Sequence, residues 1–183
     1  EAIRITIVPG FSLYRSLNRI DASGLAKYDS LLTRAQDPEF IKQLTGMNLT
    51  SLEGFMLPET YVFDIKSPID SLLSIPVREF FKMMKKYDIN PKQIPNFYDK
   101  LILASIVEKE SAHEDEREII AGVYLNRLKK GMRLQSCPTV DYLLEPQGIK
   151  RKVLTGEDLA IPSPYNTYLN DGLPPTPICN PSL

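Results

Sequence analysis

Apolar and polar residues alternate along residues 3–8, and the run ends at Pro9-Gly10. This alternation predicts a strand followed by a turn. Ser12 is then placed to cap a helix over residues 13–20, where the apolar side chains recur at helical spacing and share one face. The chain is therefore expected to open with a strand, a turn and an amphipathic helix.

Further helices and a second strand are expected before a first subdomain ends. Asp29 or Ser30 could open a second helix, and a third is expected over residues 38–44. Residues 51–63 have the aromatic and β-branched character of a strand, which Pro58 interrupts at an edge or bulge. Strand, short helices and strand together predict a compact first subdomain.

The centre of the chain is expected to be helical. Residues 67–94 are largely amphipathic, and Asn90-Pro91 stops the pattern. Residues 101–111, LILASIVEKES, point apolar side chains in nearly every direction at about 100° per residue, which predicts a helix buried on most sides. Residues 114–131 predict a second helix, because acids crowd its start and Lys-Lys-Gly closes it.

The pattern changes after the second of these helices. MRLQ at residues 132–135 and TVDYLL at residues 139–144 resemble short strands between loops, and six of the last 22 residues are proline. Proline fixes loops without secondary structure, so binding groups could be held rigidly there. The expected fold class is α+β, with a helix-rich centre, Pro-rich loops and small sheet pieces at both ends.

Composition narrows the possible partners. The 183 residues are 43% hydrophobic, and 22 basic against 23 acidic residues leave a net charge of -1, which argues against nucleic acid or anionic lipid as the partner. No apolar run approaches the length of about 20 residues that a membrane span needs. One histidine and two cysteines without metal-ligand spacing argue against a structural zinc site, and no cofactor is expected.

Two glutamates stand at the end of the apolar 101–111 segment. Glu108 shares its side of the predicted helix with alanine and serine side chains, which leave room for a ligand, whereas Glu110 projects among bulky aliphatic residues and could reach His113 or Arg117. Partial desolvation should raise the pKa of Glu108, the condition for a general acid near neutral pH. The alternative is a buried glutamate satisfied by backbone amides or an arginine.

Four stretches together resemble the endolytic murein transglycosylases, the MltG-type or YceG-like family of bacterial cell-wall enzymes. They are LEGFMLPETY (residues 52–61), LILASIVEKES, AGVYLNRLKKGMRLQSCPTVDY (121–142) and SPYNTYLNDGLPPTPICNP (163–181). The resemblance implies a LysM-like subdomain over residues 1–65 and a transglycosylase catalytic domain over residues 66–183. It also implies that the family's chain extends beyond both ends, with a membrane anchor and a location at the periplasmic face of the inner membrane.

The resemblance implies cleavage of peptidoglycan glycan strands between N-acetylmuramic acid and N-acetylglucosamine, leaving 1,6-anhydro ends. One carboxylic acid protonates the glycosidic oxygen and then helps the sugar's own 6-hydroxyl attack the anomeric carbon, so the second carboxylate of ordinary glycosidases is not needed. Cell-wall synthases are left open as partners. The family motif places the acid on Glu108, and saccharide-binding roles fall on Gln135, Tyr165, Asn166, Tyr168 and Glu53.

Other readings remain open. A non-catalytic glycan-binding module would act through the LysM-like part, and a cysteine protease or acyltransferase would pair Cys137 with His113. That pair lacks an obvious orienting third group. Cys137 also stands where the family has an acidic residue, and with Cys179 it allows one disulfide or none. Asn126 and Arg127 are expected to tie the helix pair to the loops.

Overall fold

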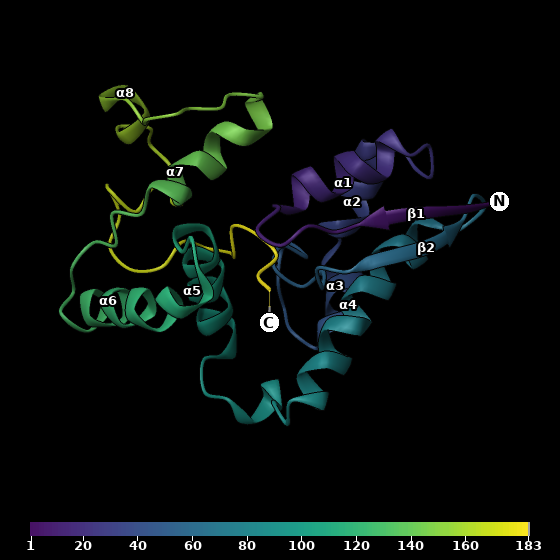
Figure 1. Cartoon of the computed structure of the whole chain (residues 1–183), viewed down its shortest axis with the longest axis horizontal. Helices are drawn as coiled ribbons and strands as arrows, with labels where there is room; N and C mark the ends of the chain where they lie inside the picture. The colour runs from purple at the N-terminus through teal and green to yellow at the C-terminus, as the bar shows by residue number, and fades with distance from the viewer. Residues whose placement is uncertain (183) are drawn as a thin grey trace. The chain divides into compact units, whose positions relative to one another are not determined.

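A computed structural model describes residues 1–182 of the chain (Figure 1). The chain forms two compact units: residues 1–97 together with the segment from Asn180 onward, and Tyr98–Cys179. This division does not coincide with the predicted boundary between residues 65 and 66. The reason is that α4 (Ile69–Lys86) packs against α2 (Tyr28–Ala35) and α3 (Pro38–Thr45) and so belongs to the first unit.

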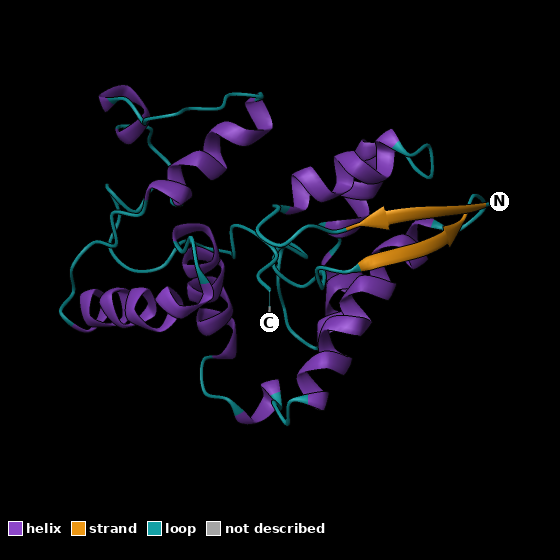
Figure 2. Cartoon of the chain, in the orientation of Figure 1, coloured by secondary structure: helices purple, strands orange, loops and turns teal. Residues whose placement is uncertain are grey.

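The first unit contains a two-stranded antiparallel sheet of β1 (Ala2–Thr6) and β2 (Thr60–Asp64). Tyr61 and Phe63 are buried, whereas Val62 between them is 61% exposed, the alternation of a sheet with one covered face. Within residues 1–182 these are the only strands (Figure 2). The α+β class is supported, but the sheet piece expected at the C-terminal end is wrong.

Helices complete the first unit. Ser12 caps the first of them, as predicted, because its Oγ accepts a hydrogen bond from the amide of Arg15 at 3.1 Å. The second begins at Tyr28, before the predicted Asp29 or Ser30, because the carboxylate of Asp21 accepts from the Tyr28 amide at 3.1 Å. The elements are α1 (Leu13–Ala22), α2 (Tyr28–Ala35), α3 (Pro38–Thr45), α4 and a 3-10 turn over Pro91–Gln93.

The strand predicted over residues 51–63 is shorter than expected. Only β2 is extended, and residues 52–57 form a buried turn instead. Gly54 has φ +89°, and the amide of Phe55 donates to the carbonyl of Leu52 at 3.1 Å. The apolar run therefore belongs to a turn inside the core, where Phe55 stacks on Phe81.

The second unit is helical. Residues 101–110 lie in α5, which is buried on most sides as predicted, and Ser111 follows its last residue. The predicted 114–131 helix is α6, which starts three residues late because a 3-10 turn precedes it; Gly131 follows the helix with φ +66°. The elements are α5 (Phe97–Glu110), a 3-10 turn (Glu114–Glu116), α6 (Arg117–Lys129), α7 (Cys137–Leu144), a 3-10 turn (Glu145–Gln147) and α8 (Gly156–Leu159).

Neither strand predicted after Gly131 forms. TVDYLL lies in α7, where Pro138 occupies the first turn and Thr139 Oγ1 donates to the carbonyl of Ser136 at 2.7 Å. Proline is well tolerated at this position of a helix. MRLQ is a loop, because Gln135 has φ +51° and cannot continue a strand.

The end of the chain runs over the second unit without a helix or strand from residue 161 to Cys179. Cys137 and Cys179 are both free thiols. Within residues 1–182, no helix is long and apolar enough to cross a membrane, and no cluster of three or more metal-ligating side chains occurs.

Candidate active site

Glu110, at the last turn of α5, has one carboxylate oxygen held in place. Its Oε1 accepts a hydrogen bond from the hydroxyl of Tyr124 at 2.8 Å and another from the hydroxyl of Ser136 at 2.9 Å. Among residues 1–182, no group hydrogen-bonds to the other oxygen, Oε2. The carboxyl group is thus oriented through one oxygen and keeps the second for a ligand.

Glu110 also lines a pocket of about 310 Å³ in the second unit. The pocket combines a carboxylate, a phenol, a guanidinium and an amide with aliphatic side chains from α6. Such a mixture of a few convergent polar groups on an apolar wall is typical of small-molecule sites. The lining residues are Glu110, Ile120, Val123, Tyr124, Arg127, Gln135 and Cys137.

The polar wall of this pocket is rigid. Ser136 is fully buried; its amide donates to Thr167 Oγ1 at 2.9 Å, and its carbonyl accepts from Thr139 Oγ1. The amide of Gln135 donates to the carbonyl of Thr167 at 3.0 Å. Gln135 is held at φ +51°, a conformation that costs a non-glycine residue energy and is enriched at functional sites.

Burial and the Glu110 carboxylate raise the pKa of two neighbouring acidic groups, Tyr124 and Asp141. Burial first, and then the hydrogen bond to Glu110, raises the pKa of Tyr124, so its phenol stays protonated and donates to Glu110 at neutral pH. The pKa of Asp141 is also raised, mainly by burial. The guanidinium of Arg127 donates through Nη1 to the carbonyl of Leu134, which confirms that Arg127 ties α6 to the following loop.

Glu108 is placed differently. Its carboxylate forms an ion pair with the guanidinium of Arg117 at 3.3 Å, and its side chain is only 9% exposed. Arg117 begins α6, so this pair joins the end of α5 to the start of the next helix. Arg117 was predicted as a partner of Glu110 instead, which is wrong, and Glu108 is not among the residues that line the pocket.

The small-residue side of α5 is partly covered by the chain itself. Ser105 is fully buried, and its Oγ accepts a hydrogen bond from the amide of Ile178 at 3.0 Å. Cys179 Sγ contacts the carbonyl of Ser105 at 3.2 Å. Space that the sequence assigned to a ligand beside Glu108 is therefore occupied, at this position, by the C-terminal segment.

Tyr168 lies beside the pocket through Cys137. The two side chains are in hydrogen-bond contact, with Sγ and the hydroxyl oxygen 3.1 Å apart. This bond, together with burial, raises the pKa of Tyr168 to about 12. No hydrogen bond within the described residues joins His113 to Cys137, so the geometry gives a cysteine nucleophile no base.

Tyr165 and Asn166 support the loop. Asn166 is fully buried, and its Nδ2 donates to the carbonyls of Leu159 and Ile161 at 3.0 and 2.9 Å. The Tyr165 hydroxyl is 3.0 Å from Thr176 Oγ1. Neither residue is among those that line the pocket; Asn166 is buried, whereas Tyr165 is partly exposed beside it.

Glu53 lies in the first unit and is fully buried. Both of its carboxylate oxygens accept from the amide of Leu13, at 2.8 and 2.9 Å. Leu13 is the first residue of α1, and a negative charge at a helix N-terminus stabilises the helix. The burial and hydrogen bonds of Glu53 are therefore those of a structural acid.

Comparison with known proteins places the chain in a family. A model of the YceG-like family matches residues 1–183, the whole of the chain. The chain belongs to the YceG-like family. A solved structure of a putative YceG-like protein from Listeria monocytogenes matches it with a TM-score of 0.84 and 34% identity, over 98% of this chain and 63% of that one.

Two curated relatives of this YceG-like chain are named endolytic murein transglycosylase. The Bacillus subtilis protein is 32% identical over 98% of this chain and 53% of its own length. The protein of Streptococcus pneumoniae serotype 2 is 34% identical over 85% of this chain and 31% of its own length. The chain thus spans about half, or less, of the curated relatives that it matches.

The sequence predicted only some of the residues that form this candidate site. Of the predicted residues, Gln135 lines the pocket and Tyr168 adjoins it, while the partners of the Glu110 carboxylate, Tyr124 and Ser136, were not anticipated. The available signal was the spacing of Glu110 and Tyr124 on two helices expected to pair. A tyrosine hydroxyl buried between such helices needs a hydrogen-bond partner, and a carboxylate is a strong one.

Proposed function

We propose that the protein is an endolytic lytic transglycosylase of peptidoglycan, that it cuts between N-acetylmuramic acid and N-acetylglucosamine, and that Glu110 is its acid and base. Membership of the YceG-like family and the names of the curated relatives support the reaction class. The observation that carries the assignment of the acid is the Glu110 carboxylate itself. It lines a pocket with one oxygen anchored and the other without a hydrogen bond from the described residues.

In the proposed reaction Glu110 enters protonated on Oε2. It gives this proton to the glycosidic oxygen as the bond from that oxygen to the anomeric carbon breaks, and N-acetylglucosamine leaves with a free hydroxyl. The 6-hydroxyl of the muramic acid then attacks the anomeric carbon and returns its proton to Glu110. No water is consumed, and the product carries a 1,6-anhydro ring.

The neighbouring groups have matching roles in this proposal. Tyr124 and Ser136 stabilise the carboxylate that remains after proton transfer, because hydrogen bonds to a charged acceptor are stronger than those to a neutral one. The amide of Gln135 and the guanidinium of Arg127 face the same pocket and can meet hydroxyl and N-acetyl oxygens. Glu108, the acid that sequence reasoning favoured, remains a prediction that the geometry favours less.

The reaction is tested by incubating purified peptidoglycan sacculi with the protein and identifying the released fragments by mass spectrometry. The expected result is glycan fragments that end in 1,6-anhydro-N-acetylmuramic acid, 18 mass units lighter than hydrolysis products because no water is added. Fragments with reducing muramic acid ends would refute the transglycosylase mechanism. Binding to sacculi without any cleavage would favour the non-catalytic glycan-binding module.

Tyr124→Phe is expected to lower turnover about fivefold while leaving substrate affinity unchanged. The variant removes one of two hydrogen bonds to the Glu110 carboxylate, worth about 1 kcal/mol. Initial rates on soluble glycan fragments measure the effect. Tyr61→Phe is the matched control: Tyr61 is also buried and donates its hydroxyl, to the carbonyl of Leu57 at 2.7 Å. Equal rate losses in both variants would mean that Tyr124 acts only on stability.

The predicted LysM-like subdomain over residues 1–65 and the catalytic domain over residues 66–183 stay predictions, as does a location at the periplasmic face of the inner membrane. The proposed site, however, needs only residues of the second unit. All seven residues that line the pocket, and Ser136, fall between Tyr98 and Cys179.

A further inference from the structure

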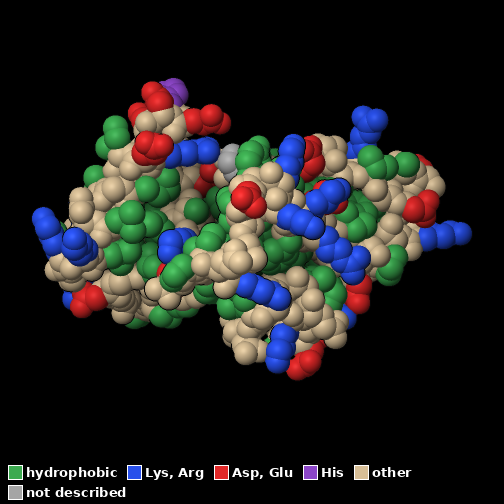
Figure 3. Space-filling model, turned by 90° about the horizontal axis from the view of Figure 1, so that it is seen from below, with side chains coloured by type: hydrophobic (Ala, Val, Ile, Leu, Met, Phe, Trp, Pro, Cys, Tyr) green, Lys and Arg blue, Asp and Glu red, His purple; other side chains and the backbone are tan. Residues whose placement is uncertain are grey.

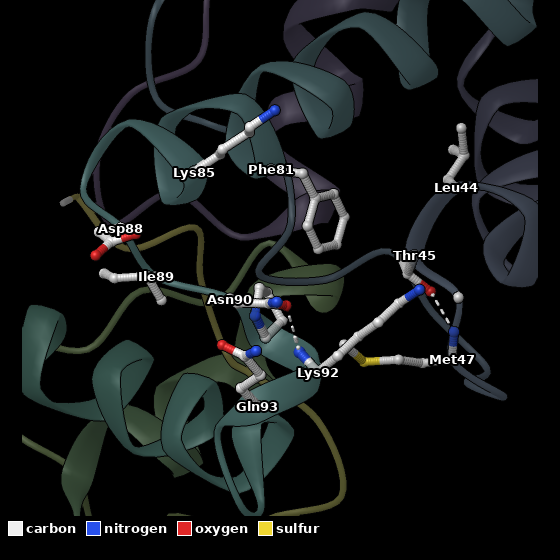
Figure 4. Close-up of a pocket in the computed structure, with 12 residues that line it drawn as sticks. Leu44, Thr45, Met47, Phe81, Lys85, Asp88, Ile89, Asn90, Lys92 and Gln93 are labelled. Carbon is white, nitrogen blue, oxygen red and sulfur yellow. Dashed lines mark hydrogen bonds between the residues drawn. The ribbon is translucent and has the colours of Figure 1, made fainter.

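A second and larger pocket lies entirely within the first unit. Its volume is about 730 Å³, and it is formed where α3 ends, where α4 ends and where the chain continues through residues 88–93 (Figure 4). The proposed reaction uses none of its residues. A pocket of this size can enclose a ligand of several residues or sugars.

The floor of this pocket is apolar and rigid. Phe81 stacks on Phe55 with ring centroids 5.9 Å apart and meets Phe80 edge to face at 5.3 Å. These two contacts fix its ring, which Figure 4 shows directed toward the middle of the pocket. Leu44, Met47 and Ile89 add aliphatic surface around it.

The rim carries an excess of positive charge. Lys85 comes from the last turn of α4 and Lys92 from the following 3-10 turn, and among residues 1–182 neither ammonium group forms an ion pair. Asp88 is the one acid that lines the pocket. Lys and Arg side chains also gather on the face seen in Figure 3, the side toward which the C-terminal end of α4 points in Figure 1.

The shape of the rim is set by local hydrogen bonds. Asn90 Oδ1 accepts from the amide of Lys92 at 3.1 Å, and its carbonyl accepts from the amide of Gln93 at 2.9 Å. On the opposite side Thr45 Oγ1 accepts from the amide of Met47 at 3.1 Å. Asp88 is held at φ +57°. The two lysines therefore project from a fixed backbone.

We propose that this pocket binds a short peptide that carries a free carboxylate beside small apolar side chains, the chemistry of the peptide arms of peptidoglycan. The lysines pair with the carboxylates, and the apolar floor receives the side chains. Naming peptidoglycan as the source of the peptide rests on the proposed function, whereas the chemistry of the ligand rests on the pocket alone.

Other ligand classes fit less well. An uncharged sugar would leave both lysines without a partner, although it could stack on Phe81. A phosphate would satisfy the lysines, but it would leave the apolar floor of Leu44, Met47 and Phe81 without a partner. A peptide with a carboxylate can pair with the lysines and pack its side chains on the apolar floor at the same time.

The test titrates the protein with a synthetic pentapeptide of L-Ala, γ-D-Glu, L-Lys, D-Ala and D-Ala, followed by amide NMR shifts and by calorimetry. Shift changes are expected at Phe81, Ile89 and Lys92. Lys85→Glu and Lys92→Glu should each weaken binding about fivefold, the equivalent of about 1 kcal/mol for an exposed charge pair. Lys86→Glu is the matched control, because Lys86 adjoins Lys85 on α4, is exposed and does not line the pocket.

Three results would overturn the inference: no binding of the pentapeptide, equal weakening by Lys86→Glu, or stronger shifts at this pocket with a peptide-free N-acetylglucosamine oligomer. Cleavage of glycan is measured in parallel on the same samples. Peptide binding without cleavage would leave the inference standing and refute the proposed reaction. Cleavage without peptide binding would refute the inference and leave the proposed reaction standing.

Discussion

Glu110→Gln is expected to lower the rate of glycan cleavage by about 10²- to 10⁴-fold, the usual contribution of a general acid and base. The amide cannot give a proton to the glycosidic oxygen or take one from the 6-hydroxyl. The fold should be retained, because the amide oxygen of glutamine can still accept hydrogen bonds from Tyr124 and Ser136. Cleavage rates on sacculi, with circular dichroism to verify folding, measure the effect.

Glu108→Gln is the matched comparison for Glu110→Gln, because it is the same substitution two residues earlier on the same helix. It removes the charge that pairs with Arg117, whose Nε is buried without a hydrogen-bond partner among the described residues. We expect a loss of about 1–3 kcal/mol in the free energy of unfolding, below the usual cost of breaking a fully buried pair because Arg117 is 29% exposed. Turnover of the folded fraction should change far less than in Glu110→Gln.

The opposite pattern would decide against the pocket. If Glu108→Gln abolishes cleavage in a folded protein while Glu110→Gln cleaves normally, Glu108 is the acid and the pocket beside Glu110 is not the reaction site. If both variants cleave at the wild-type rate, neither glutamate is the acid. Glu114→Gln, an exposed glutamate in the turn after α5, controls for the loss of one negative charge near the site.

The contrast between these glutamates indicates what sequence can and cannot predict. Helical periodicity correctly predicted that α5 is buried on most sides and that Glu108 and Glu110 leave it in different directions. It could not predict what covers each side. The side with small residues is partly filled by Ile178 and Cys179, more than 70 residues away along the chain, whereas the side with bulky residues opens onto the pocket.

Local sequence patterns gave wrong secondary-structure predictions where tertiary contacts decide the structure. Val, Thr and Tyr favour strands, so residues 139–144 were predicted as one, but the described residues offer this segment no neighbouring strand and it forms α7. The sequence of this segment also had helical spacing, since the apolar residues Val140 and Leu144 are four residues apart. Both are buried in α7. Strong local signals, such as Ser12 as a cap and Gly131 after α6, were predicted correctly because they depend on their immediate neighbours.

Glu53 provides the second large effect, on stability instead of chemistry. Glu53→Gln is expected to lower the free energy of unfolding by about 1.5–3 kcal/mol, the range for hydrogen bonds to a charged group. The glutamine keeps one acceptor for the Leu13 amide but loses the charge at the N-terminus of α1 and places an amide N–H₂ in a fully buried site. Urea unfolding followed by circular dichroism measures the loss.

Glu59→Gln is the control for this prediction, because Glu59 lies in the same unit, is exposed and should change stability by less than about 0.5 kcal/mol. Glycan affinity of the folded protein should be the same in both variants, since the carboxylate of Glu53 is turned to the helix and has no exposed surface. Unchanged stability with a clear loss of glycan affinity in Glu53→Gln would instead place this residue in the binding cleft. That outcome would require the buried turn of residues 52–57 to open when the glycan binds, because a side chain without exposed surface can contact a sugar only after its cover has moved.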